Sequence, residues 1–177
     1  TPTFFSCNQL KRLISGIFDK AVKHPKIELS FEGHPNNTTK EHLQTLYDLG
    51  FKRVSFGVQD YDGKVQKAIH RIQSFDQVAY VTETARKIGY QSVSHDIIYG
   101  LPFQTIDSIK NTIEKTNLLT PDRISFYSYA HVPWMKGNGQ RGFNDEDLPK
   151  KKDNFMNWEE IYCNKTAIMK LEWIILQ

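Results

Sequence analysis

Polar residues stand at or near the predicted exits of successive strands, where their side chains could bind a small polar ligand. Glu32 follows the segment "ELSF", Gln59 ends "SFGVQ", and Asp96 stands in "SHDIIYG" before three apolar or aromatic residues. Carboxylates and an amide accept hydrogen bonds from hydroxyl and ammonium groups, and the amide also donates. No nucleophile with an adjacent base accompanies them, so this set favours ligand binding over covalent catalysis.

Arginines add the opposite charge. Arg53 opens a predicted strand and Arg71 lies in "HRIQ". A guanidinium group forms a bidentate fork with a carboxylate. With the acids, these side chains suit a ligand that has a ribose, an ammonium group and a carboxylate. Each acid taken alone also has an ordinary alternative as a helix cap or salt-bridge partner, and for Asp60 this is a cap on the "DGKVQKAIH" turn.

Strands must bring these side chains together. Stretches rich in β-branched and aromatic residues predict strands at 27–31, 53–58, 92–99 and 123–129. Helical patterns separate them, which predicts βαβ units and a parallel sheet. The carboxyl ends of parallel strands share one rim, so we expect Glu32, Gln59 and Asp96 to converge there. Short strands favour a barrel or partial barrel, with a doubly wound sheet as the rival.

Local signals mark where the helices begin and end. Thr38, with Glu41 three residues on, is predicted to cap the second helix, and Gly50 to end it. The same capping spacing recurs in "SCNQ" and "SFDQ", and Gly89 is predicted to end the third helix. A fourth helix is predicted to start at Thr105.

Composition and charge argue against several classes of function. The 177 residues carry a net charge of +3, and their aromatic residues are not interleaved with basic ones, so no nucleic-acid partner is expected. No run is long enough to span a membrane, and no signal peptide is expected. Cys7 and Cys163 are far apart in sequence and predict neither a metal cluster nor a disulfide framework. We expect a cytoplasmic, monomeric protein.

Other patterns predict structural roles. The histidines His34, His95 and His131 share no metal-ligand spacing, so we expect them to serve structure or surface. The segment "GNGQRG" at 137–142 formally matches a dinucleotide-binding glycine motif. It neither follows a strand directly nor opens a helix, so we expect a loop without a nucleotide. A further helical pattern is predicted near 158–163.

Longer motifs carry a family resemblance. "FGVQDYDGKVQKAIHRIQ", "HDIIYGLPFQT" and "PDRISFYSYAHVPW" together resemble the oxygen-independent coproporphyrinogen III oxidases of the radical SAM superfamily. The resemblance implies an α/β partial parallel (β/α) barrel core over 1–149, followed by a divergent helical tail over 150–177. It also implies that a four-iron four-sulfur cluster reductively cleaves S-adenosylmethionine. The implied product is protoporphyrinogen IX, made in haem biosynthesis by oxidative decarboxylation of propionates of coproporphyrinogen III.

The resemblance also implies site residues and partners. The implied partners are coproporphyrinogen III and an electron donor for the cluster, and no residue is implied as a catalytic acid, base or nucleophile. The residues that match the family's contacts with S-adenosylmethionine are Thr1, Glu32, Gln59, Arg71, Asp96 and Ala130.

The resemblance places the cluster ligands outside these residues. The family holds its cluster with three cysteines, which are expected before Thr1, and its C-terminal domain is expected after the matching region. The chain is therefore expected to be inactive by itself. "GVQD" followed by "HRIQ" favours the oxidase over the related haem chaperones. The other alternative is a non-catalytic barrel remnant that acts as an interaction module.

We predict that the 177 residues alone bind no iron–sulfur cluster, because they contain two cysteines and such clusters are held by several thiolates. Anaerobic reconstitution with iron and sulfide, followed by absorption spectroscopy and iron analysis, measures this. Near-stoichiometric iron with cluster absorption would contradict the prediction.

Overall fold

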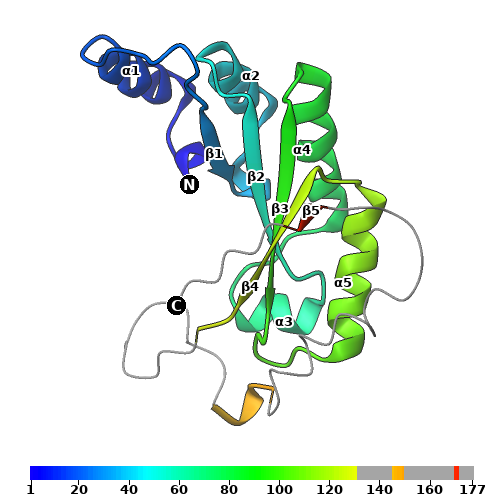
Figure 1. The fold of residues 1–177 in the computed structure, drawn as a ribbon. Coiled ribbons are helices and arrows are strands. Elements are labelled where there is room, and N and C mark those ends of the chain that lie inside the picture. Colours follow the sequence, from blue (N-terminus) through cyan, green and yellow to red (C-terminus); the bar gives the residue numbers. More distant parts are fainter. Residues whose placement is uncertain (131–144, 150–169, 172–177) are drawn as a thin grey trace.

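The structure, a computed structural model, describes residues 1–130, 145–149 and 170–171 (Figure 1). Its strands are β1 (Ser30–Gly33), β2 (Arg53–Gln59), β3 (Ser92–Tyr99), β4 (Arg123–Ser128) and β5 (Lys170–Leu171). Its α-helices are α1 (Cys7–Phe18), α2 (Lys40–Asp48), α3 (Gly63–Ala68), α4 (Phe75–Ile88) and α5 (Ile106–Leu118). Short 3-10 helices lie at Pro2–Phe4, Pro35–Asn37 and Asp145–Asp147.

The strands form one parallel sheet that grows in a single direction. Their order is β1-β2-β3-β4-β5, so each strand pairs with the one that precedes it along the chain. A doubly wound sheet has a point at which this order reverses, whereas a (β/α) barrel does not. The predicted partial barrel is therefore confirmed, and the doubly wound alternative is wrong for the described strands.

The core lies between one face of this sheet and the helices (Figure 1). Strands β1–β3 pack against α1, α2 and α4, and the carboxyl half of β3 packs with β4 against α5. The strand residues in these two clusters are Phe31, Val54, Phe56, Val93, Ile97, Tyr99, Ile124 and Phe126. Because the helices use this face, the alternate residues of each strand point to the other one.

The first strand is displaced from its predicted place at 27–31. β1 begins at Ser30 and ends at Gly33, whereas Ile27 is 46% exposed and donates its N–H to the His24 carbonyl. Gly33 pairs with Phe56, and a Cβ at Gly33 would lie 2.9 Å from that ring, so glycine permits the pairing. The sequence prediction counted the β-branched side chain of Ile27 but missed this close approach. Glu32 consequently lies within β1 rather than beyond it.

The second helix begins one residue later than predicted. Thr39, not Thr38, is the N-cap of α2, and it shares a capping box with His42 instead of the predicted Glu41. The Thr38 hydroxyl is buried and donates to the His34 carbonyl at 2.9 Å. Either of these consecutive threonines could cap the helix by its residue type. The burial of Thr38 leaves Thr39 as the N-cap.

The remaining predicted helix starts and ends are confirmed, although Gln77 donates its side-chain amide to the Pro35 carbonyl at 2.9 Å and completes no capping box with Ser74. Ser6, Ser74 and Thr105 are the N-caps of α1, α4 and α5. Gly50 and Gly89 follow α2 and α4 with φ of +103° and +108°, in the left-handed region that favours glycine.

Several predictions fall on residues beyond the described ones. His131, the 137–142 loop and the helical pattern near 158–163 all lie there. In the predicted helical tail the structure describes only Lys170–Leu171, which are extended and pair with Arg123–Ile124 of β4. Within the described ranges, no helix is long and apolar enough to span a bilayer.

Asp60, directly after β2, is a fully buried scaffold residue. Its Oδ1 accepts hydrogen bonds from the Asp62 N–H at 2.6 Å and the Thr112 hydroxyl at 3.0 Å, and its Oδ2 accepts from the Gln104 amide. Burial raises the pKa of Asp60, and these hydrogen bonds lower it. The N-cap of α3 is Asp62, so the alternative in which Asp60 caps that turn is wrong.

We expect Thr112→Val to lower the free energy of unfolding by about 2–3 kcal/mol. The Thr112 hydroxyl donates to Asp60 and accepts the Tyr61 N–H at 3.0 Å, and valine leaves both groups buried without this partner. Urea unfolding measures the change. Thr112→Ser keeps the hydroxyl and is the control, with an expected loss below about 1 kcal/mol for the missing methyl group. Equal losses in the two variants would contradict this role.

Candidate functional site

The face of the sheet opposite the helices is polar. Strand β3 alternates strictly between buried and partly exposed residues, and β1, β2 and β4 follow the same alternation over most of their length. Parallel strands covered on both faces are apolar throughout. We call the face opposite the helices the inner face. Its residues are Ser30, Glu32, Arg53, Ser55, Ser94, Asp96, Arg123, Ser125 and Tyr127. Such a face is suited to a polar ligand.

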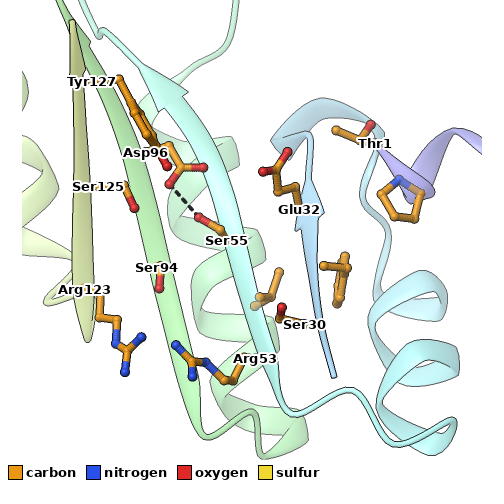
Figure 2. Close-up of a pocket in the computed structure, with 13 residues that line it drawn as sticks. Thr1, Ser30, Glu32, Arg53, Ser55, Ser94, Asp96, Arg123, Ser125 and Tyr127 are labelled. Atoms are coloured by element: carbon orange, nitrogen blue, oxygen red, sulfur yellow. Dashed lines mark hydrogen bonds between the residues drawn. The ribbon is translucent and has the colours of Figure 1, made fainter. Parts of the chain in front are cut away.

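A cavity of about 540 Å³ lies on this inner face (Figure 2). Thr1 and Pro2 border it beside β1, and side chains of β1 to β4 form the rest of its wall. Of the residues singled out in the sequence, Thr1, Glu32, Arg53 and Asp96 line the cavity, and Figure 2 shows Asp96 and Glu32 on either side of β2. The cavity has the size of a small-molecule site.

Asp96 lies on the inner face of β3 and is held by hydroxyl groups. Its Oδ1 accepts a hydrogen bond from the Ser55 hydroxyl at 2.8 Å (Figure 2). Burial raises the pKa of Asp96, hydrogen bonding from Ser55 and Ser125 lowers it, Glu32 raises it and Arg71 lowers it. A carboxylate has more acceptor sites than these hydroxyls use, so Asp96 keeps capacity for an ammonium or hydroxyl donor.

Gln59 and Arg71 meet over Gly57 at the end of β2. The β2–β3 register shifts between Gly57 and Gln59, and Gln59 has a φ of +66°. Arg71 Nη2 donates to the Gly57 carbonyl at 2.9 Å. A Cβ at Gly57 would lie 2.7 Å from Arg71 Nη2 and 2.7 Å from Gln59 Nε2. The absence of a side chain at 57 therefore leaves the space in which these two groups converge.

Both side chains retain unused hydrogen-bonding capacity. Gln59 Oε1 and Arg71 Nε are buried and have no hydrogen-bond partner among the described residues. Burial lowers the pKa of Arg71 and the nearby Asp96 raises it. Buried polar atoms are nearly always hydrogen-bonded in native proteins, so two of them on adjacent side chains indicate a ligand or water at this place.

Buried amides hold the end of β2 in this shape. Gln73 Nε2 donates to the carbonyls of Gly57 and Val58. Gln66 Nε2 donates to the carbonyls of Asp60 at 2.9 Å and Gln73 at 2.8 Å. These bonds tie the strand end to the segment that carries Arg71, whose guanidinium donates to the Gly57 carbonyl.

The structure separates the predicted residues into three groups. Thr1, Glu32 and Asp96 line the cavity, and Gln59 and Arg71 converge beside it at the end of β2. Ala130 is exposed and lies beyond β4, just after Tyr129, whose N–H donates to the Tyr99 carbonyl at 2.8 Å. Ala130 is not among the residues that line the cavity.

Sequence analysis missed the inner-face neighbours of the acids. Ser55, Ser94, Ser125 and Tyr127 were not singled out, and neither was Arg123. The signal was available, because residues two apart on a strand share a face, as Ser94 and Asp96 do. Single serines in strands are too ordinary to be selected without that register.

The histidines serve structure where the structure describes them. His95 is fully buried with Nε2 2.9 Å from the Thr82 hydroxyl, and burial lowers its pKa to about 3. His34 caps the Pro35–Asn37 turn by accepting the Asn36 N–H at 3.2 Å. No cluster of three or more metal-binding side chains occurs among residues 1–130, 145–149 and 170–171.

Comparison with known proteins gives the class to which this fold and rim belong. The chain belongs to the radical SAM superfamily, whose family pattern it matches over residues 8–116. The chain is 47% identical over 154 residues to the oxygen-independent coproporphyrinogen III oxidase of Helicobacter pylori, covering 86% of this chain and 34% of that protein. The enzyme of the same name from Pseudomonas aeruginosa is 40% identical over 151 residues, 84% of this chain and 33% of that protein.

Solved structures agree with this assignment. The coproporphyrinogen III oxidase HemN of Escherichia coli, described as a radical SAM enzyme, superposes with a TM-score of 0.83 at 34% identity, covering 89% of this chain and 37% of that one. Methylornithine synthase shares the fold, with a TM-score of 0.63 at 17% identity over 88% of this chain and 43% of that one. The chain spans about a third of the length of the curated relatives that it matches.

The cofactors of this family are S-adenosylmethionine and a four-iron four-sulfur cluster. The inner rim fits the first of these. It offers carboxylates to an ammonium or hydroxyl group, and a guanidinium to a carboxylate. The buried Gln59 Oε1 and Arg71 Nε, which have no partner in the part of the chain that the structure describes, are atoms that such a ligand would satisfy.

We predict that Gly57→Ala weakens S-adenosylmethionine binding at least tenfold, about 1.4 kcal/mol. The new Cβ would lie 2.7 Å from both Arg71 Nη2 and Gln59 Nε2 and would push the two groups apart. Calorimetric titration of the cluster-loaded protein that carries this chain measures it. Gly63→Ala is the matched control, because a Cβ at Gly63 meets nothing within 4 Å. Unchanged affinity in Gly57→Ala would show that the two groups do not act together.

Proposed function

We propose that this chain forms the S-adenosylmethionine-binding part of a radical SAM enzyme that converts coproporphyrinogen III to protoporphyrinogen IX. The observation that carries the proposal is the convergence of Gln59 and Arg71 over Gly57, beside the Asp96 carboxylate. Relatives that bear the name of this oxidase are 36–47% identical to this chain over 151–166 residues, which supports the choice of substrate.

Each predicted residue has a physical role in this proposal. Asp96 and Gln59 accept hydrogen bonds from the ribose hydroxyls or the ammonium group, and Glu32 adds a second carboxylate across β2. Arg71 pairs with the methionyl carboxylate, for which its fork is the right shape. Thr1 borders the ligand beside β1, and Ala130 would reach it from the chain beyond the end of β4.

The protein part of the chemistry is binding and orientation. The bound cofactor pair supplies the hydrogen-atom abstraction that starts the oxidative decarboxylation. The residues of this chain hold the ligand in a cavity whose wall consists of strands, so its position is fixed by the sheet. None of them is assigned as a catalytic acid, base or nucleophile.

The proposal extends to the setting of the enzyme. It includes an electron donor for the cluster, a monomeric and cytoplasmic protein, and a 1–149 barrel core followed by the 150–177 tail. It also includes inactivity of the 177 residues by themselves. Product analysis separates the oxidase from a haem carrier of the same fold, because a carrier would form no protoporphyrinogen.

We expect Asp96→Asn and Arg71→Ala each to weaken S-adenosylmethionine binding at least tenfold. Removing one partner of a charged hydrogen bond in a desolvated site costs about 2–5 kcal/mol. Calorimetry on the cluster-loaded protein that carries this chain, with iron content checked first, measures the affinity. Asp48→Asn removes the same charge from an exposed position on α2 and is the control. A variant that binds as tightly as the parent would remove its residue from the site.

Binding should also depend on pH through Asp96. Burial raises the pKa of this carboxyl group, so it protonates earlier on acidification than an exposed aspartate does. The ionised form is the acceptor, and affinity should therefore fall as the pH is lowered through the raised pKa. Calorimetry over a pH series measures this, and Asp96→Asn should lose that part of the dependence. An identical pH profile in the variant would contradict the role.

A further inference from the structure

The inner cavity has an acidic end and a basic end. Arg53 opens β2 and Arg123 opens β4, and both line the same cavity as Glu32 and Asp96. Figure 2 shows the two arginine side chains converging below Ser94, away from the carboxylates near the top of the view. The proposed roles of the rim use neither arginine.

The sheet register explains how these arginines come to face one another. Arg53 pairs with Ser92 of β3, and Arg123 pairs with Ser94, so the two side chains approach β3 from its two sides. Asp96 lies four residues beyond Ser92 and two residues beyond Ser94 on β3. At the usual rise of a strand, these spacings separate Asp96 from the two partners by about 7–13 Å. The inner-face residues between the two ends include Ser55, Ser94 and Ser125, whose small side chains leave the cavity open along its length.

Among the described residues that line the basic end, Lys52, Arg53 and Arg123 are positively charged and Glu28 is negatively charged. Arg53 Nη1 lies 2.9 Å from Glu28 Oε2, but the Glu28 side chain is 75% exposed and that of Arg53 is 32% exposed. Ion pairs this accessible to water contribute little and exchange readily. A second cavity of about 270 Å³ adjoins this end and is lined by Lys52, Arg53, Arg123 and Glu28 among others. An anion placed between the arginines would meet a favourable field.

We propose that Arg53 and Arg123 form a carboxylate subsite that binds a propionate of the substrate and selects for it. This inference rests on the proposed function. Guanidinium forks bind carboxylates in bidentate geometry, and two of them facing one gap define a position for one carboxylate. Two propionates of coproporphyrinogen III react and the others keep their carboxylates. The subsite holds one of the retained groups, so the arginines position the substrate and take no part in the chemistry.

The cofactor also has a carboxylate, but the structure favours the substrate at this end. Arg71 lies close enough to Asp96 to perturb its pKa, and it is the arginine at the cofactor rim. Arg53 and Arg123 lie at the opposite end of the cavity, at the amino ends of β2 and β4. A ligand that reaches both ends of the cavity must span the serine-lined stretch between them, as a large tetrapyrrole does.

The test uses the cluster-loaded protein that carries this chain and two separate titrations. Coproporphyrin III, the stable oxidised form of the substrate, is titrated by fluorescence, and S-adenosylmethionine is titrated by calorimetry. Arg53→Gln and Arg123→Gln should each weaken coproporphyrin III binding at least tenfold and leave S-adenosylmethionine affinity within about twofold. Arg53→Lys keeps the charge without the fork and should lose several-fold.

Two further variants sharpen the result. Lys87→Gln removes the same charge from an exposed pair with Glu83 on α4 and should leave both affinities unchanged. Glu28→Gln removes the carboxylate that competes for Arg53 and should strengthen coproporphyrin III binding. An increase in affinity on removal of a neighbouring acid is a result that a merely structural role for Arg53 would not produce.

Several results would overturn the inference. The inference would be overturned if the arginine variants, including Arg53→Lys, bound coproporphyrin III as tightly as the parent protein does. A loss confined to S-adenosylmethionine would assign the arginines to the cofactor. Equal loss of both ligands with a lower melting temperature would make them structural. A parent protein that binds S-adenosylmethionine but no coproporphyrin III would refute the proposed substrate, and this subsite with it.

Discussion

Two buried glutamine side chains hold the end of β2, and the geometry of the rim depends on them. The Gln73 side-chain amide donates hydrogen bonds to the carbonyls of Gly57 and Val58, and the Gln66 amide donates to those of Asp60 and Gln73. The Gly57 and Val58 carbonyls lie where the β2–β3 register shifts. An unpaired buried carbonyl costs about 1–3 kcal/mol, which makes this arrangement hard to change locally. The left-handed backbone at Gln59 and the Arg71 guanidinium, which donates to the Gly57 carbonyl, both lie at this strand end.

The rim concentrates charges that burial disfavours. Desolvation raises the pKa of Asp96 and lowers the pKa of Arg71, and each group partly offsets the effect on the other. Glu32 works in the opposite direction, because a second carboxylate nearby raises the pKa of Asp96. A ligand that brings an ammonium group and a carboxylate would satisfy both signs together. Such tension between burial and charge is common at functional sites.

The uncovered face of the sheet is what makes room for a ligand. Every described helix element that enters the core clusters packs on the same face, and the other face carries serines, acids and arginines. Serines near the middle keep the cavity open, and the larger side chains stand toward its ends.

The amino-acid sequence determined the elements and much of the chemistry by itself. Strand–helix alternation gave the parallel sheet, and glycines such as Gly89 marked helix ends, because these signals act over a few residues. Asp96 and Gln59 were selected because acids and amides at apolar strand ends are unusual. Only the tertiary structure decided between Thr38 and Thr39 as a cap, moved β1 so that Glu32 falls within it, and made Asp60 a scaffold residue. It also brought Arg123 opposite Arg53, because register joins residues that are 70 positions apart in the chain, and no local pattern carries that information.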